Sequence, residues 1–301
     1  MTGGSQQSEH SASYEFHGRH SQRLSRSDLF EIHDSSWFPA HLRNLVTDAL
    51  QAVWEVTNAY RPIAPLLRDA MAAAGTTRVL DLCSGAGGPW IQLARHVSRV
   101  LHYPVTVCLT DKHPNPEAFA RAALHSESQI RSHPSPVYAT CVPVGLRGFR
   151  TIFSSAHHLG VEELNKVVAN ALECRTGIAI FEACQREWRA ILSVVCVPFL
   201  GLLATPWIRP FRWSRLFWTY FVPVVPFVLL FDGWMSCLRS YSQADYLALV
   251  AAHAGSGYRW QVGVQRSGII PITYLIGYPV SATVLPAGGA CNLEGTSNPN
   301  G

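Results

Sequence analysis

Short apolar segments alternate with helical segments from residue 78 to residue 181. The segments expected to form strands are 78–82, 105–110, 137–142, 151–153 and 177–181. Apolar residues at helical spacing fill the segments between them, at 90–101, 116–124 and 161–172. Strands that are apolar along most of their length belong to sheets covered on both faces. The pattern therefore predicts an α/β fold with a mostly parallel sheet.

The flanking segments complete the predicted domain, which spans residues 28–285. Residues 28–75 have helical spacing, and the β-rich runs 258–265 and 272–280 predict a closing antiparallel hairpin. Residues 1–27 are polar and lack the apolar run of a secretory signal, so we expect a disordered leader on an intracellular protein. Residues 286–301 are expected to form a disordered tail.

The turn after the first predicted strand is rich in glycine and reads Asp81-Leu82-Cys83-Ser84-Gly85-Ala86-Gly87-Gly88. A glycine turn between a strand and a helix lets the backbone approach a polar ligand closely. Asp111 ends the second predicted strand, where a carboxylate can bind ribose hydroxyls. A dinucleotide turn needs a further glycine where this chain has Trp90, so the spacing disfavours NAD and FAD.

On these residues the chain resembles the class I S-adenosylmethionine-dependent methyltransferases, a Rossmann-like superfamily whose first motif is acidic-x-Gly-x-Gly-x-Gly. The resemblance covers roughly residues 60–185 and the hairpin, with Cys83 standing where the family usually has glycine. It implies S-adenosylmethionine as cofactor, with Asp81 near its methionine end and Asp111 at its ribose. The other cofactor-binding residues that we expect are Cys83, Ser84, Gly85, Gly87, Ser154 and, beside adenine, Val142 and Val144.

Two adjacent histidines, His157 and His158, follow the fourth predicted strand. Side chains just beyond a strand of an open α/β sheet line the ligand crevice. A neutral imidazole there can take a proton from an acceptor hydroxyl. Alternatively the histidines only cap a helix, because methyl transfer can proceed by alignment of donor and acceptor without a base.

A polar segment, Glu31 to Trp37, precedes the sheet in sequence. One interpretation makes it part of a helical lid, with Glu31, Asp34 and Trp37 at the substrate and His33 as a further catalytic candidate. Tyr60 is a substrate candidate as well. The other interpretation assigns the acidic residues to helix capping and Trp37 to the core.

Residues 186–240 form an insertion longer than one crossover helix requires. Residues 190–208 and 216–231 carry no charge and flank an arginine-rich tip with Arg209, Arg212 and Arg215. As helices these arms would be roughly 28 and 24 Å long, close to the thickness of a bilayer core. Prolines within the arms and arginines at the tip argue against a full span.

Two further interpretations of the arms remain open. In the first, residues 190–231 lie in a membrane surface, with the arginines at lipid phosphates and Trp207, Trp213 and Trp218 at headgroup depth. In the second, the arms form an apolar lid or a homodimer contact. Both interpretations favour a small lipophilic substrate.

Composition excludes several other classes of protein. The net charge of +4 is scattered rather than gathered in a stripe, which argues against a nucleic-acid partner. The eight cysteines show no zinc-ligand spacing, so no metal site is predicted from the sequence. The sequence thus predicts a cytoplasmic or membrane-associated methyltransferase of small-molecule biosynthesis. The alternatives are a protein of the same fold that catalyses a cyclisation or rearrangement, and a membrane-associated binding protein.

Overall fold

The computed structural model describes residues 26, 29–126, 129–267 and 270–280. The predicted tail and, apart from Arg26, the predicted leader lie outside these residues.

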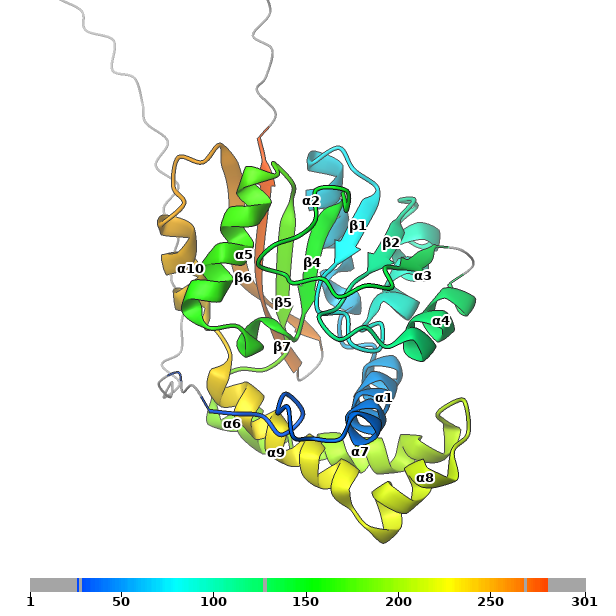
Figure 1. Ribbon diagram of the computed structural model, residues 1–301. Helices are drawn as coiled ribbons and strands as arrows, with labels where there is room; N and C mark the ends of the chain where they lie inside the picture. The colour runs from blue at the N-terminus through cyan, green and yellow to red at the C-terminus, as the bar shows by residue number, and fades with distance from the viewer. Residues whose placement is uncertain (1–25, 27–28, 127–128, 268–269, 281–301) are drawn as a thin grey trace, which may run out of the picture.

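A seven-stranded sheet forms the centre of the molecule, in the order β3-β2-β1-β4-β5-β7-β6 (Figure 1). The strands are β1 (Arg78–Asp81), β2 (Thr106–Leu109), β3 (Ile130–Ser132), β4 (Phe149–Phe153), β5 (Ile178–Glu182), β6 (Tyr258–Ser267) and β7 (Ile270–Pro279). Strands β1 to β5 are parallel, and β7 runs antiparallel to both β5 and β6. The predicted sheet and its closing hairpin are confirmed.

The prediction of a strand over residues 137–142 was wrong. The third strand is Ile130–Ser132, and residues 137–142 form a loop with one isolated bridge between Tyr138 and Cys141. Val137 and Val142 are apolar because they are buried beneath the helix that follows β4, not because they pair in the sheet. This buried loop has the same apolar sequence pattern as a buried strand.

Helices cover both faces of the sheet (Figure 1). One face packs against α2 (Ala64–Ala73), α3 (Trp90–Arg99) and α4 (Pro116–Leu124), the other against α5 (Val161–Glu173) and α10 (Gln243–Ala251). The ends of these helices follow local sequence rules. Asn115 caps α4 through a hydrogen bond from the Ala118 amide, and Pro116 occupies the first helical position. Two short 3₁₀ turns are η1 (Arg61–Ile63) and η2 (Ala156–His158).

The chain before the sheet and the insertion pack together at one end of the molecule (Figure 1). Residues 31–37 form turns rather than the predicted helix, and α1 (Ala40–Thr57) follows them. The insertion contains α6 (Trp188–Ser193), α7 (Cys196–Ala204), η3 (Thr205–Trp207), α8 (Trp213–Leu216), the π-helical turn η4 (Phe217–Phe221) and α9 (Val224–Arg239). Leu45 and Val46 of α1 pack against Val225 and Val228 of α9, which attaches the insertion to the domain.

Two stretches of the insertion have the length and apolar composition of a membrane span. One runs from Trp188 to Trp207, and the other combines Trp213–Phe221 with Val224–Arg239 across a bend of 67°. The second stretch contains Asp232, whose carboxylate accepts hydrogen bonds from the backbone amides of Ile32 and His33. This face of α9 is therefore part of the protein interior.

The arginines at the tip of the insertion are not all exposed, as the predicted contact with lipid phosphates requires. Arg215 is 2% exposed and pairs with Asp48 of α1 at 2.8 Å, and Arg121 of α4 pairs with the same carboxylate. Arg212 pairs with Glu117. Arg215 is thus unavailable to lipid phosphates, whereas Arg209 is exposed.

The Asp48 ion pair gives a test of how the insertion is held. Removing one partner of a buried pair leaves an uncompensated charge, so Asp48→Ala is expected to lower the free energy of unfolding by about 3–5 kcal/mol. Glu117→Ala breaks a more exposed pair and is expected to cost about 1 kcal/mol or less. Urea denaturation measures both values, and equal losses would contradict a structural role for the Arg215 contact.

Candidate active site at the carboxyl edge of the sheet

The glycine loop after β1 has a backbone that mostly glycine can adopt. Gly85, Gly87 and Gly88 have φ values of 55°, 113° and 54°. Cys83 also has a positive φ, 57°, which explains why the resembling family prefers glycine there. A left-handed conformation costs a non-glycine residue roughly 1–2 kcal/mol. The conformation of this loop therefore costs free energy at Cys83, as is typical of strained loops at functional sites.

Asp81 holds this loop from inside the protein. Its carboxyl group is 1% exposed and accepts hydrogen bonds of 2.6 Å from both Ser84 Oγ and Thr151 Oγ1. Burial raises the pKa of Asp81 to about 7, although these hydrogen bonds act to lower it. The geometry gives Asp81 and Ser84 a role in shaping the loop, whereas their predicted contact with a cofactor stays a prediction.

Asp111 lies just beyond β2, where it fixes the outer side of the loop. Its Oδ2 accepts a 2.8 Å hydrogen bond from the Gly85 amide, and its Oδ1 accepts one of 2.8 Å from the His113 amide. The two residues that the sequence analysis linked, Gly85 and Asp111, are therefore in direct contact.

A second strained position lies across from the loop, at the end of β4. Ser154 has a φ of 42°, and its hydroxyl is hydrogen-bonded to the Tyr60 hydroxyl. The next residue, Ser155, donates from Oγ to the Cys83 carbonyl at 3.4 Å. Strands β1 and β4 are neighbours where the strand order reverses, and open α/β sheets bind ligands at this point.

His157 and His158 follow in η2, and each contacts a carboxylate. The buried His157 Nδ1 lies 2.8 Å from Glu182 Oε2 at the end of β5, and His158 Nδ1 lies 2.6 Å from Asp34 Oδ2. Glu31 lies beside both rings, with an oxygen 3.7 Å from His157 Nε2 and another 3.5 Å from His158 Nδ1. Residues from distant parts of the sequence thus meet in one cluster.

Helix α9 closes this cluster from the side of the insertion. Ser236 donates to Glu31 Oε1 at 3.2 Å, and Arg239 Nη1 lies 3.7 Å from the same oxygen and 3.8 Å from Asp34. Asp232 binds the backbone of Ile32 and His33, as described above. The cluster therefore joins the N-terminal turns, the ends of β4 and β5, and the insertion.

Burial and charge shift several pKa values in the cluster. Burial raises the pKa of Glu31, although the charge of His158 acts against the rise. Burial also acts to raise the pKa of Asp34, but hydrogen bonds with His158 and His33 outweigh it and hold that pKa well below its usual range. For His33, burial acts to lower the pKa, yet the hydrogen bond with Asp34 and the surrounding carboxylates raise it.

Other predicted site residues lie apart from this cluster. Val142 is buried against the α5 side of the sheet, and Val144 is 80% exposed. Both lie in the loop after β3 and not directly after a strand, and their place beside adenine stays a prediction. Trp37 is 68% exposed, which contradicts its predicted place in the core, and Phe38 is buried instead. Tyr60 is buried among aromatic rings, where its hydroxyl meets Ser154.

Three charged members of the cluster were not predicted from the sequence, namely Glu182, Asp232 and Arg239, and Ser236 was not predicted either. Glu182 carried a usable signal, because it ends an otherwise apolar strand in the same way that Asp111 follows β2. Asp232 and Arg239 lie in the insertion, and their approach to the site depends on tertiary packing.

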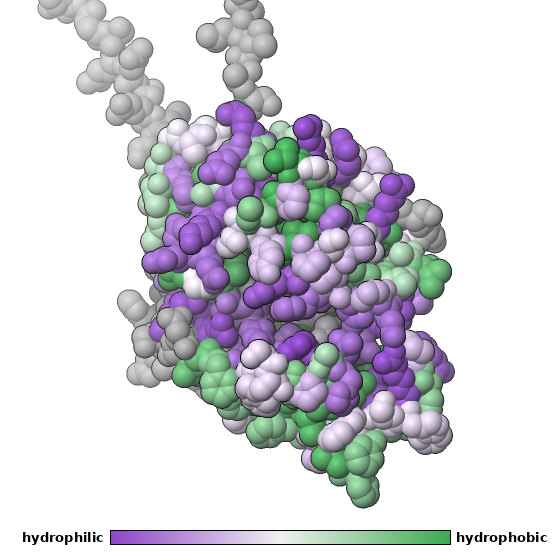
Figure 2. All heavy atoms as spheres, viewed as in Figure 1, coloured by the Kyte–Doolittle hydropathy of each residue, from purple (hydrophilic) through white to green (hydrophobic). Residues whose placement is uncertain are grey.

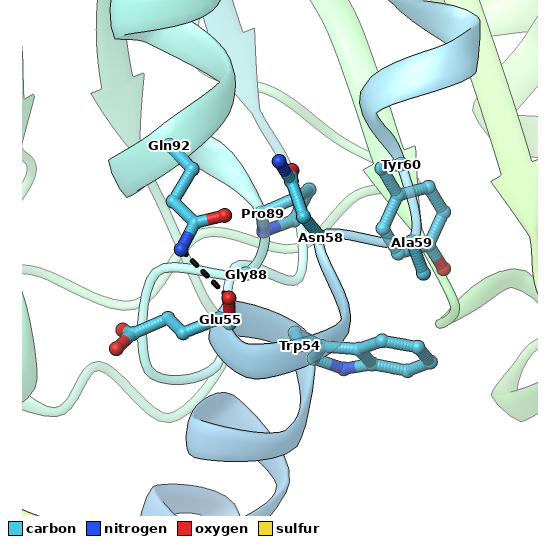
Figure 3. A pocket seen from close by; sticks show the side chains of 8 residues that line it. All are labelled: Trp54, Glu55, Asn58, Ala59, Tyr60, Gly88, Pro89 and Gln92. Atoms are coloured by element: carbon cyan, nitrogen blue, oxygen red, sulfur yellow. Dashed lines mark hydrogen bonds between the residues drawn. The ribbon is translucent and has the colours of Figure 1, made fainter. Parts of the chain in front are cut away.

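Helix α1 covers the glycine loop on its outer side (Figure 3). Gln51 Nε2 donates to the Gly88 carbonyl at 2.7 Å, and Gln92 Nε2 donates to the Glu55 carbonyl at 2.7 Å. The cavity enclosed there, lined in part by Trp54 and Tyr60, measures about 10 Å³. That volume is on the order of one water molecule, so this cavity is too small for a nucleoside.

The strand order, the closing hairpin and the glycine loop after β1 together give the chain the Rossmann-like fold of class I S-adenosylmethionine-dependent methyltransferases. Its sequence matches no protein-family model and no curated protein.

Solved structures with a similar fold share little sequence with this chain. The methyltransferase domain of bacterial CtHen1 is 11% identical, with a TM-score of 0.45, over 72% of this chain and 98% of that domain. An O-methyltransferase from neocarzinostatin biosynthesis, NcsB1, solved with S-adenosylmethionine and 2-hydroxy-5-methyl naphthoic acid, is 13% identical, with a TM-score of 0.43 over 77% of this chain. A putative O-methyltransferase from Nostoc punctiforme PCC 73102 is 13% identical, with a TM-score of 0.46 over 84% of this chain. The chain spans 56% and 64% of the length of the last two proteins.

The buried carboxyl of Asp81 predicts a pH dependence of stability. An aspartate that titrates near pH 7 when folded and near 3.9 when unfolded binds more protons in the folded state between these values. Its contribution to stability is therefore lost as pH rises from about 4 to 7. We expect urea denaturation to show a larger decrease in unfolding free energy from pH 5 to pH 8 in the wild type than in Asp81→Asn. The exposed Asp69→Asn variant is the control, and an unchanged pH dependence in Asp81→Asn would contradict the assignment.

Proposed function

We propose that the protein transfers a methyl group from S-adenosylmethionine to a small lipophilic molecule. The observation that carries the proposal is the contact of the glycine loop after β1 with the turn after β4, at the reversal point of the strand order. Ser155 of that turn donates to the Cys83 carbonyl, and His157 and His158 follow it in the chain. Asp111 supplies a carboxylate at the neighbouring strand end, placed on the loop itself.

The loop residues fit a nucleoside ligand with a charged amino-acid end. Positive φ values at Gly85, Gly87 and Gly88 turn the backbone without side chains in the way, so main-chain groups can approach the ligand. Asp111 would bind the ribose hydroxyls with the lone pairs that its two backbone contacts leave free. Because α1 covers the loop, binding would be accompanied by a shift of α1 away from Gly88.

The two histidines offer a base for the methyl acceptor. In each case a carboxylate orients the ring, Glu182 for His157 and Asp34 for His158. His157 is 3% exposed in its side chain and His158 is 26% exposed, so an acceptor reaches His158 more readily. Proton removal by a positioned imidazole contributes typically about a hundredfold or more to the rate.

Support for a lipophilic acceptor comes from the outer face of the insertion. Large apolar side chains are exposed there, namely Trp188, Leu192, Phe199, Leu203, Trp207, Phe211, Trp213, Phe217, Tyr220, Phe221, Phe227 and Trp234. Figure 2 shows apolar residues gathered at this end of the molecule. Helix α9 presents Phe227 and Trp234 on this face and Asp232 and Arg239 to the cluster, so the two regions share one helix.

We further propose that this apolar face binds the surface of a lipid bilayer. Tryptophan and other aromatic side chains suit the headgroup region. Residues 188–231 contain no acidic residue, and the exposed Arg189 and Arg209 complement anionic headgroups. The contacts of Asp232 and Arg215 inside the protein favour a hairpin lying on the membrane over one spanning it.

Cofactor binding gives the first test of the proposal. Calorimetry should detect binding of S-adenosylmethionine to the wild type, and its loss in Gly85→Val and Asp111→Ala. The φ of 55° strains any side chain at Gly85, and the methyl groups of valine would extend from a Cβ that already contacts Thr47 Cγ2 at 3.6 Å. Gly145→Val is the matched control, because an added Cβ there meets nothing within 4 Å and the residue has no positive φ.

Transfer of a labelled methyl group to a panel of lipophilic alcohols, phenols and amines completes this test. Binding without transfer to any acceptor would favour a reaction that retains the cofactor. Absence of binding in a folded wild-type protein would contradict the proposal.

Membrane binding gives the second test. Flotation with vesicles of phosphatidylcholine and phosphatidylglycerol should carry the wild type to the top of a gradient, and replacement of Trp213, Phe217 and Phe221 by serine should reduce the floated fraction at least tenfold. Roughly 1.5–3 kcal/mol per buried large apolar side chain supports a loss of this size.

The control replaces Val56, Leu124 and Val144, which are also exposed but lie outside the insertion, by serine. Equal flotation of the two triple variants would contradict the assignment. A wild type that stays in the dense fraction and sediments as a dimer would instead assign the face to a second copy of the chain.

A further inference from the structure

Three side chains of the buried cluster offer metal-ligand atoms to one point. One ligand atom each from Glu31, His157 and His158 lies within 4.8 Å of the others. Glu31 and His157 come from turns far apart in the sequence, which is why the spacing of residues predicted no metal site.

The separations between Glu31 and the two rings exceed the usual length of a hydrogen bond and suit ligands that share an ion. Glu31 Oε1 lies 3.7 Å from His157 Nε2, and Glu31 Oε2 lies 3.5 Å from His158 Nδ1. With metal–ligand distances of about 2.0–2.2 Å, two ligands of a tetrahedral ion lie roughly 3.4 Å apart. The two separations between Glu31 and the rings are close to that value.

Hydrogen bonds from neighbouring groups already orient these three side chains. Nδ1–H of His157 donates to Glu182 at 2.8 Å, which leaves Nε2 with its lone pair on the side of Glu31. Glu182 is itself fixed by the Ala156 amide at 2.7 Å, and Ser236 donates to Glu31 at 3.2 Å. In protein metal sites a histidine ligand usually donates its other ring N–H to a carboxylate or a carbonyl, as His157 does to Glu182.

The charges around the group favour a cation. The carboxyl groups of Glu31, Asp34, Glu182 and Asp232 surround it, and the guanidinium of Arg239 approaches Glu31 and Asp34. A divalent ion would offset this excess more fully than Arg239 does, since Arg239 stays 3.7 Å or more from both carboxylates it approaches.

We propose that Glu31, His157 and His158 bind a divalent transition-metal ion, with Asp34 placed to become a fourth ligand. Two imidazoles with one or two carboxylates suit zinc, manganese or iron(II) better than magnesium or calcium, which prefer oxygen ligands alone. Binding would displace the proton between His158 Nδ1 and Asp34, so the site takes up metal in exchange for a proton.

This inference stands on the cluster alone and does not depend on the proposed methyl transfer. If that transfer is also correct, an ion at this place would polarise the oxygen of the methyl acceptor, and the two histidines would hold the ion in place of acting as the base.

Cobalt(II) titration of the full-length protein, after dialysis against a chelator, tests the site without any measurement of activity. In the wild type, the visible absorption of bound cobalt should increase until one equivalent of cobalt has been added, and excess zinc should abolish this absorption. Glu31→Gln and His158→Gln should each weaken binding about 100-fold or more. Glu182→Gln, which changes the hydrogen-bond partner of His157, should weaken it about 10–100-fold. His113→Gln, which replaces an exposed histidine outside the cluster, should bind like the wild type.

Circular dichroism establishes that each variant is folded. If Glu31→Gln does not fold, His158→Gln alone carries the test, because His158 is partly exposed and its replacement disturbs the interior less. A wild type that binds no cobalt would overturn the proposal. So would binding that Glu31→Gln and His158→Gln leave unchanged, because the ion would then lie elsewhere.

Discussion

The contact between His157 and Glu182 is the interaction around which the site is arranged. It joins the end of β4 to the end of β5, and Glu31, on the other side of the His157 ring, belongs to the N-terminal turns. Asp232 of α9 holds those turns through the backbone of Ile32 and His33. A buried group of this kind is stable only when its charges are paired, so the three segments depend on one another for their positions. The insertion is thereby part of the site and not an appendage to it.

Two residues at the same edge of the sheet have strained backbone conformations. Cys83 and Ser154 both have positive φ values, and they follow the neighbouring strands β1 and β4, where the strand order reverses. Asp81 stabilises the first of these turns through Ser84 and Thr151, and the hydroxyl of Tyr60 contacts Ser154 in the second. Strain that surrounding contacts maintain is typical of sites prepared for a ligand. The proposed cofactor site is consistent with this arrangement.

Sequence alone predicted the sheet well because strands β1, β2, β4 and β5 are apolar, short and separated by clear helices. It failed at β3, because Arg131 and Ser132 make that edge strand polar while the following loop buries Val137 and Val142. For the site, the glycine loop and Asp111 were predictable from their place after strands, and their contact is observed. For the cluster, the sequence predicted some of the residues but not their contacts. His157, His158, Glu31 and Asp34 were chosen individually, but their meeting with Glu182, Asp232 and Arg239 depends on how α9 packs, which residue spacing does not encode.

The central claim is that the glycine loop and the histidine cluster border one ligand site. A crystal structure of the protein with S-adenosylhomocysteine tests it most directly. We expect the ribose of this ligand at Asp111, its amino-acid end over Gly85 to Gly87, and its sulfur directed toward His157 and His158. A ligand bound away from the loop, or one whose sulfur points away from the histidines, would contradict it.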